Sequence, residues 1–157
     1  MFSVEPDIEV ELRSLVIADG KAPDGTIPAG EIETQSGGAI YNSGDLRLLN
    51  CTVRDSHAGN GTDDTNSAPG GHGGGVYSTG SLTLENSVIS HNAAGDGRPW
   101  GCIASLCHPV PTESSASGGN GGGIYASGPL SVTASMVVSN TAGAYGADRP
   151  QSSGGDG

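Results

Sequence analysis

The sequence predicts an all-β protein, a right-handed parallel β-helix with three short strands per turn and one long variable loop. Three observations predict this fold. A glycine-rich segment followed by an apolar residue and tyrosine occurs three times, at residues 37–41, 73–77 and 121–125. The same alternation of apolar and polar residues follows each copy, which is typical of strands with one buried face. The copies start 36 and then 48 residues apart and keep the same phase, which indicates stacked turns rather than antiparallel hairpins.

Each unit contains three short extended pieces, because its apolar residues alternate and many are β-branched. In the second unit we expect strands near residues 74–78, 81–85 and 87–91. We expect Gly80 at the first corner, since glycine readily adopts a positive φ. We expect Asn86 at the second corner, since asparagine tolerates the left-handed conformation. The third corner is the long loop, where the units differ in length.

A weaker copy of the repeat precedes the other three. Residues 10–20 match residues 82–92 at an offset of 72, which gives about three full turns plus one partial turn. We therefore expect residues 1–157 to form a single β-helix segment. Its repeat units lie near residues 8–36 (partial), 37–72, 73–120 and 121–157. The chain ends in a glycine-rich run of the kind that precedes each repeat, so we expect a fragment of a longer protein.

Equivalent apolar residues are expected to stack in columns inside the helix. Cys51 and Ser87 share an inward position just beyond the second corner. The predicted interior columns contain Leu46, Leu48, Val53, Leu82, Leu84, Ile89, Leu130, Val132 and Val137, with Ile40, Val76 and Ile124.

A column of tyrosines is predicted on the outer face. Because the residue before each tyrosine points inward, Tyr41, Tyr77 and Tyr125 point outward and lie one above another. Such a column can stack against sugar rings, or it can cover its own sheet. Both interpretations remain open, and the three tyrosines are candidate binding residues.

Charge argues against nucleic-acid binding, and hydropathy argues against a membrane-spanning segment. The 157 residues carry a net charge of −11 with only six Lys and Arg, whereas nucleic-acid binding needs clustered basic residues. No apolar run approaches the roughly 18 residues that span a bilayer. Residues 1–14 lack the basic start and apolar stretch of a secretion signal. We therefore expect neither nucleic-acid binding nor a membrane-spanning segment.

The units follow the order Gly-Gly-Gly-Ile-Tyr, small-Gly, Leu-Thr-Leu, Asn-Ser, Val-Ile-Ser, Asn. This order resembles the repeats of bacterial polymorphic outer membrane proteins and related extracellular repeat proteins, which are right-handed β-helices. The resemblance covers residues 37–56, 73–95 and 121–143 well, and residues 8–20 weakly. It implies a secreted or cell-surface protein with a structural or adhesive role. The broader β-helix class also includes polysaccharide lyases and hydrolases.

The acidic loop residues are the candidates for metal or acid–base chemistry. Asp63, Asp64 and Asp96 suit a hard cation such as calcium, which would bind weakly and serve structure. The glycine run at residues 70–75 lacks the aspartate of the calcium-binding nonapeptide repeat. The loop carboxylates lie in Gly- and Pro-rich stretches, so we assign no catalytic residues. No other cofactor is expected.

The loop between the second and third tyrosine units is the longest and carries the only tryptophan. Trp100 could anchor a sugar or a protein, or it could fold back over the sheet. Cys102 and Cys107 lie five residues apart and could close a small disulfide. With His108 they supply three zinc ligands at most, fewer than a structural zinc site needs.

Taken together, the sequence predicts a non-catalytic structural or adhesive segment of a secreted or cell-surface bacterial protein. Expected partners are surface glycans, proteins of a host or neighbouring cell, and the rest of the parent chain. The alternative is a polysaccharide-binding or polysaccharide-degrading β-helix protein. Ordered Asp and Arg side chains on adjacent turns would favour the alternative, whereas a wall of Ser, Thr and Tyr would favour the first prediction.

Overall fold

The computed structural model describes residues 1–25, 36–61, 69–97 and 116–145. These residues form β-strands and turns without a helix. The strands are β1 (Phe2–Val4), β2 (Glu9–Arg13), β3 (Val16–Ala18), β4 (Ile40–Asn42), β5 (Asp45–Leu49), β6 (Thr52–Arg54), β7 (Val76–Ser78), β8 (Ser81–Glu85), β9 (Val88–Ser90), β10 (Ile124–Ala126), β11 (Leu130–Thr133) and β12 (Met136–Val138).

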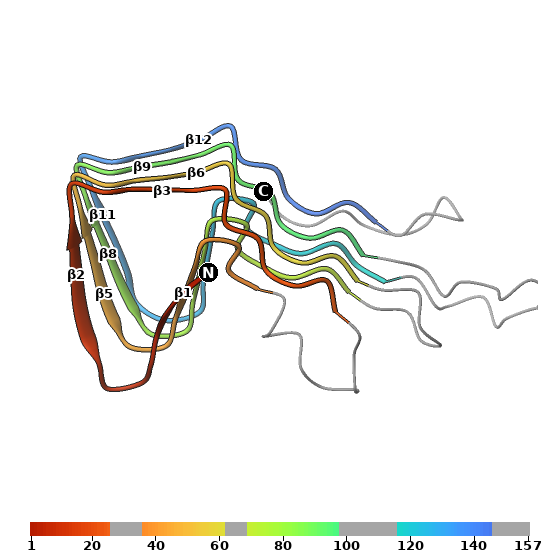
Figure 1. Cartoon of the computed structure of the whole chain (residues 1–157), viewed down its shortest axis with the longest axis horizontal. Helices are drawn as coiled ribbons and strands as arrows, with labels where there is room; N and C mark the ends of the chain where they lie inside the picture. Colours follow the sequence, from red (N-terminus) through yellow and green to blue (C-terminus); the bar gives the residue numbers. More distant parts are fainter. Residues whose placement is uncertain (26–35, 62–68, 98–115, 146–157) are drawn as a thin grey trace, which may run out of the picture.

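The strands form three parallel sheets, each with one strand from every turn. Sheet A has the order β1-β4-β7-β10, sheet B β2-β5-β8-β11, and sheet C β3-β6-β9-β12. Figure 1 shows the three sheets as the sides of a triangle. Leu82 pairs with Leu46 on one side and with Leu130 on the other, which are the predicted offsets. The protein is therefore a parallel β-helix.

The first turn contributes a strand to each of the three sheets, one strand more than the partial unit near residues 8–36 predicted. Strand β1 pairs in parallel with β4, and Phe2 lies beside Ile40. The first turn thus begins before residue 8. The repeat pattern missed this strand because Phe2–Val4 has no glycine run before it and alternates over only three residues.

The second corner has the predicted conformation in every turn. Asn86 has φ +49°, and its equivalents Ser14, Asn50 and Ala134 have φ between +48° and +54°. Gly80 lies at the first corner, between β7 and β8, as predicted, but the expectation of a positive φ there was wrong, because Gly80 is not among the residues with positive φ. A Cβ at Gly80 would lie 2.0 Å from the carbonyl oxygen of Gly44 in the preceding turn. Glycine is required there by close stacking of backbones.

The predicted interior columns form the core. Leu46, Leu48, Val76, Leu84 and Ile89 are completely buried. Cys51 and Ser87 are also buried, as predicted. Each full burial of a Val, Leu or Ile side chain stabilises the fold by about 1.5–3 kcal/mol. The core therefore runs through the middle of the stack and becomes exposed at its two ends.

Beyond the triangle, the chain leaves each turn along one extended arm and returns along another (Figure 1). The outgoing arms include residues 56–61, 92–97 and 140–145, and the returning arms include residues 69–75 and 117–123. Neighbouring outgoing arms are hydrogen-bonded, for example from the Ala58 amide to the Ala93 carbonyl at 2.9 Å. The third corner is therefore built of stacked arms rather than of an isolated loop in each turn.

A chain of five glycines joins outgoing and returning arms, and we call it the glycine spine. The amide of each glycine from the second onward donates to the carbonyl of the one before it, at 2.8–2.9 Å. The spine contains Gly59, Gly71, Gly95, Gly119 and Gly143. A Cβ at Gly95 would lie 1.8 Å from the Gly59 carbonyl oxygen, so the arms meet backbone to backbone.

Candidate functional site

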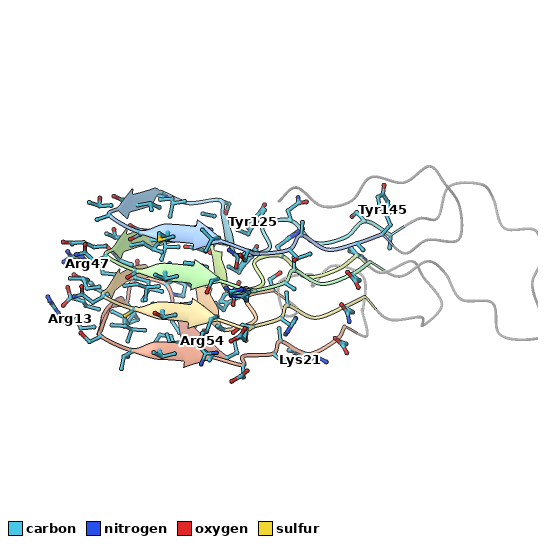
Figure 2. All side chains as sticks on the ribbon, turned by 90° about the horizontal axis from the view of Figure 1, so that it is seen from above. Arg13, Lys21, Arg47, Arg54, Tyr125 and Tyr145 are labelled. Carbon is cyan, nitrogen blue, oxygen red and sulfur yellow. The ribbon has the colours of Figure 1, made fainter. Side chains whose placement is uncertain are left out.

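The three candidate tyrosines lie in one stacked column on sheet A. The ring centroids of Tyr41 and Tyr77 are 5.2 Å apart, and those of Tyr77 and Tyr125 are 5.3 Å apart. Tyr77 is only 7% exposed, because rings of the adjacent turns cover it on both sides. Figure 2 places Tyr125 where the arms begin, far from Arg13 and Arg47 at the opposite edge. This arrangement favours the interpretation in which the column covers its own sheet.

We expect Tyr77→Leu to lower the free energy of unfolding by about 2 kcal/mol, because Tyr77 makes two ring stacks worth about 0.5–1.5 kcal/mol each. Tyr41→Leu is the matched control, since Tyr41 is half-buried and stacks on one tyrosine. It should cost about half as much. Urea unfolding measures both values. Equal losses in the two variants would contradict the role of the column.

His72 continues this aromatic cluster. Its ring lies 4.8 Å from that of Tyr125 with an angle of 17° between the planes. Its Nδ1 accepts a hydrogen bond from the Asn120 amide at 2.8 Å, and its own amide donates to Ser36 Oγ at 3.0 Å. Nδ1 must be unprotonated to accept that bond, and burial lowers the pKa of His72 below its ordinary value of 6.5. The structure therefore holds His72 neutral.

Acidification should weaken the fold through His72. The unfolded chain takes up a proton near pH 6.5 while folded His72 is still neutral, so His72 contributes its full stability above pH 6.5 and loses it as pH falls toward the lower folded pKa. Urea unfolding at about pH 7.5 and about pH 5.5 measures the difference. His72→Asn keeps an acceptor and does not titrate, so it should show a smaller drop. An unchanged drop would assign the pH dependence to other groups.

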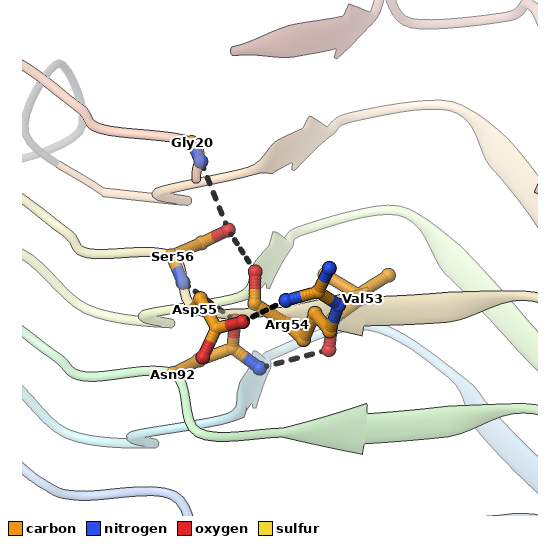
Figure 3. Close-up of polar contacts among 6 residues, drawn as sticks. All are labelled: Gly20, Val53, Arg54, Asp55, Ser56 and Asn92. Atoms are coloured by element: carbon orange, nitrogen blue, oxygen red, sulfur yellow. Dashed lines mark hydrogen bonds and ion pairs between the residues drawn. The ribbon is translucent and has the colours of Figure 1, made fainter. Parts of the chain in front are cut away.

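Side chains at the bend after sheet C link each turn to its neighbours. Asn92 is buried, its Oδ1 accepts from the Ser56 amide at 3.0 Å, and its Nδ2 donates to the Val53 carbonyl at 3.1 Å (Figure 3). Its Nδ2 also donates to Oδ1 of Asn140 in the next turn at 3.0 Å. In the preceding turn, Ser56 Oγ accepts from the Gly20 amide. These polar side chains are used for stacking.

Asp96, a predicted calcium ligand, takes part in a similar chain along the outgoing arms. The Asn60 amide donates to Asp24 Oδ1, the Asp96 amide to Asn60 Oδ1, and the Ala144 amide to Asp96 Oδ1, at 2.8–2.9 Å. Asp63 and Asp64 lie outside the described residues. Within the described part of the chain, no group of three or more His, Cys, Asp or Glu side chains could hold a metal ion. Calcium binding stays a prediction.

The structure does not test the candidates of the longest loop. Trp100, Cys102 and Cys107 lie outside the described residues, so their binding and disulfide predictions stay predictions. Cys51 has a free, buried thiol. Its amide donates to Ser87 Oγ, and the Ser87 amide donates to Ser135 Oγ, both at 3.0 Å. Cys51 thus belongs to a third chain of contacts between turns.

Sequence reasoning missed a groove on the outgoing arms. It encloses about 480 Å³, and its lining residues come from the outgoing arms of all four turns. Its lining includes Lys21, His57, Ala58, Asn60, Ala93, Ala94, Asp96, Thr141 and Ala142. The repeated three-residue spacing of polar positions was the available signal. Ala58 and Ala94 in its lining are buried, whereas Lys21, His57 and Asp96 are exposed, so these polar groups stand on its rims.

Comparison with known proteins gives no relative for this chain. No protein-family model, curated protein or solved structure matches it. Among the described residues there is no helix that is long and apolar enough to cross a membrane. The class of protein is therefore set by the geometry alone, as a four-turn parallel β-helix with stacked arms.

Proposed function

We propose that this chain is a non-catalytic structural and adhesive segment of a secreted or cell-surface bacterial protein, of the polymorphic outer membrane protein repeat type. One observation carries the proposal. The polar side chains at the bends and on the arms accept or donate hydrogen bonds between turns, as Asn92, Asp96 and Ser87 do. Groups engaged in this way hold an extended shape and are poorly placed to act as acid and base on a substrate.

The walls of the triangle support the same function. On sheet B the outward residues include Ser81, Thr83, Ser131 and Thr133. The charged residues of this wall pair with one another near the surface, since Glu11 contacts both Arg13 Nε at 2.5 Å and Arg47 Nη1 at 3.2 Å. The hydroxyl groups of β8 and β11 are suited to a solvated stalk, while β2 and β5 present charged residues on the same wall. The bacterial surface location rests on the resemblance of the repeats.

The groove favours the alternative, a polysaccharide-binding or polysaccharide-degrading protein. It crosses several turns, so an extended sugar chain could lie along it. Its rims offer Lys21, His57, Asn60 and Asp96 as hydrogen-bonding groups. Lys21 Nζ contacts Asp24 Oδ2 at 3.4 Å, however, and Oδ1 of Asn60 and Oδ1 of Asp96 each accept a backbone amide, so three of these groups are already engaged. The described residues that line the groove include no Phe, Tyr or Trp, which weakens it as a sugar site.

Co-sedimentation with a panel of insoluble polysaccharides separates these functions. We expect no release of reducing ends, since the proposal assigns no catalysis to the chain. Release would overturn the proposal in favour of a degrading enzyme. Retention without release would favour glycan adhesion, and His57→Ala and Trp100→Ala would then locate binding at the groove or the long loop. If the chain is neither retained on the polysaccharides nor releases reducing ends, the result favours a structural stalk.

A further inference from the structure

The outgoing arms carry the same two-residue motif in three consecutive turns. An Asp or Asn is followed by glycine at residues 24–25, 60–61 and 96–97. The Asn60 amide donates to Asp24 Oδ1 and the Asp96 amide donates to Asn60 Oδ1, so the three side chains form one column. Asn60 is the one amide among these three side chains, and it lies between two carboxylates.

An asparagine followed by glycine can modify itself without an enzyme or an oxidant. The Gly61 nitrogen can attack Cγ of Asn60, because glycine has no side chain that obstructs the approach. The N–Cγ bond forms, the Cγ–Nδ2 bond breaks, and Nδ2 leaves as ammonia together with the Gly61 amide proton. One water molecule then opens the five-membered ring at either carbonyl group. The products are aspartate and isoaspartate, in which the main chain runs through Cγ.

In the folded protein both reacting groups are held by one residue of the next turn. The Asp96 amide donates to Asn60 Oδ1 at 2.8 Å, and the Asp96 carbonyl accepts the Gly61 amide at 2.9 Å. Gly61 is also buried. The Gly61 nitrogen must give up its hydrogen bond before it can turn toward Cγ and lose its proton. Stacking of the second and third turns therefore blocks the reaction.

The preceding turn holds Asn60 in the same way. The Asn60 amide donates to Asp24 Oδ1 at 2.9 Å, and the Asn60 carbonyl accepts the Gly25 amide at 3.0 Å. The glycine spine passes through Gly59 and Gly95, one residue before the motifs of the second and third turns. Separation of the arms along the spine therefore also releases Asn60.

We propose that Asn60 is a self-modification site that is gated by the arms: it is silent while the second and third turns are stacked and converts to aspartate or isoaspartate once they separate. Isoaspartate adds one main-chain atom before Gly61, so the Gly61 amide no longer lies opposite the Asp96 carbonyl. Aspartate places a third carboxylate between those of Asp24 and Asp96, in turns about 4.8 Å apart. Both products oppose restacking, so a transient opening becomes permanent. The gate acts in the same way in a stalk and in a glycan-binding protein.

Peptide mapping by mass spectrometry at neutral pH measures the reaction. The folded chain should deamidate at Asn60 at least about tenfold more slowly than the chain unfolded in guanidinium chloride. Hydrogen exchange of the Gly61 amide in the folded chain measures the same opening, since exchange also requires the bond to Asp96 to break. The slowing of deamidation should therefore be of the same order as the protection of Gly61.

Three results of this experiment would overturn the proposal. Equal rates in the folded and unfolded chains would show that stacking does not protect Asn60. Deamidation of the folded chain much faster than Gly61 exchange allows would show that the reaction proceeds in the stacked state. An unfolded chain that does not react at Asn60 would show that the site has no such chemistry.

Asn60→Gln is the matched control for the permanent effect, because glutamine keeps the amide but cannot form the five-membered ring. Both chains are held in guanidinium chloride until Asn60 has reacted and are then returned to buffer. The unmodified chain should regain less of its native circular dichroism than Asn60→Gln, each relative to the same chain returned at once. Loss common to both chains belongs to other sites such as Asn120–Gly121. Asn60→Ser replaces a glutamine variant that does not fold, and equal recovery would contradict a permanent opening.

Discussion

Replacing Gly95 by alanine is expected to lower the free energy of unfolding by more than about 4 kcal/mol, the largest effect of any single substitution proposed for this protein. The new Cβ would lie 1.8 Å from the Gly59 carbonyl oxygen and 2.8 Å from the Gly71 amide nitrogen. Both neighbours are backbone atoms, which cannot turn aside as a flexible side chain can. The outgoing and returning arms must therefore separate, and the hydrogen bonds of the glycine spine on both sides of Gly95 are lost.

Urea unfolding of Gly95→Ala measures this loss. The control is Ala144→Ser, which adds one heavy atom at an exposed position of the neighbouring arm. It should change stability by less than about 0.5 kcal/mol. Similar small losses in both variants would mean that the arms do not pack backbone to backbone. Amide exchange adds a second readout, because protection should fall first at Gly119 and Gly143, whose hydrogen bonds follow Gly95 in the spine.

Asn92→Leu should cost about 4 kcal/mol. Leucine has a similar size but leaves the Ser56 amide and the Val53 carbonyl without partners in the interior. An unpaired buried polar group costs about 1–3 kcal/mol, so two of them produce a loss of this order. For a protein of this size the midpoint of thermal unfolding should fall by about 10 °C.

Asn92→Ser is the matched control for this substitution. Serine occupies the equivalent position in the preceding turn, where Ser56 Oγ accepts from the Gly20 amide. Serine at position 92 can likewise accept from the Ser56 amide, so it should lose about half as much stability as leucine. If leucine and serine cost the same, the hydrogen bonds of Asn92 do not stabilise the stack. The comparison thus separates hydrogen bonding from volume.

The sequence was sufficient for the fold because one periodicity fixes it. Alternation identified the buried face of each strand, and the offsets of 36 and 48 residues identified its neighbours, as the pairing of Leu82 with Leu46 and Leu130 confirms. The left-handed corner at Asn86 followed from local chemistry, and its equivalents share the conformation. Strand β1 was not predicted, because it lacks the glycine-rich motif that marks the other turns.

The arms and the site were less accessible from sequence, because their chemistry depends on contacts between turns. Nothing local distinguishes Gly95 of the spine from a glycine in a flexible loop; the requirement comes from the Gly59 carbonyl of another turn. Asp96 was predicted as a metal ligand from its charge, whereas its Oδ1 accepts the Ala144 amide. The packing requirement at Gly95 and the hydrogen-bonding role of Asp96 could be recognised only by aligning the loops in the register of the strands.

The measurement that tests the account most directly is the detection of scalar couplings across hydrogen bonds by nuclear magnetic resonance. The stacking register predicts a coupling from the Leu82 amide nitrogen to the Pro129 carbonyl carbon, and from Met136 to Ser87. On the arms it predicts a coupling from Gly119 to Gly95. These pairs are brought together only by parallel turns. Couplings between neighbouring strands of one unit would indicate antiparallel hairpins and contradict the β-helix.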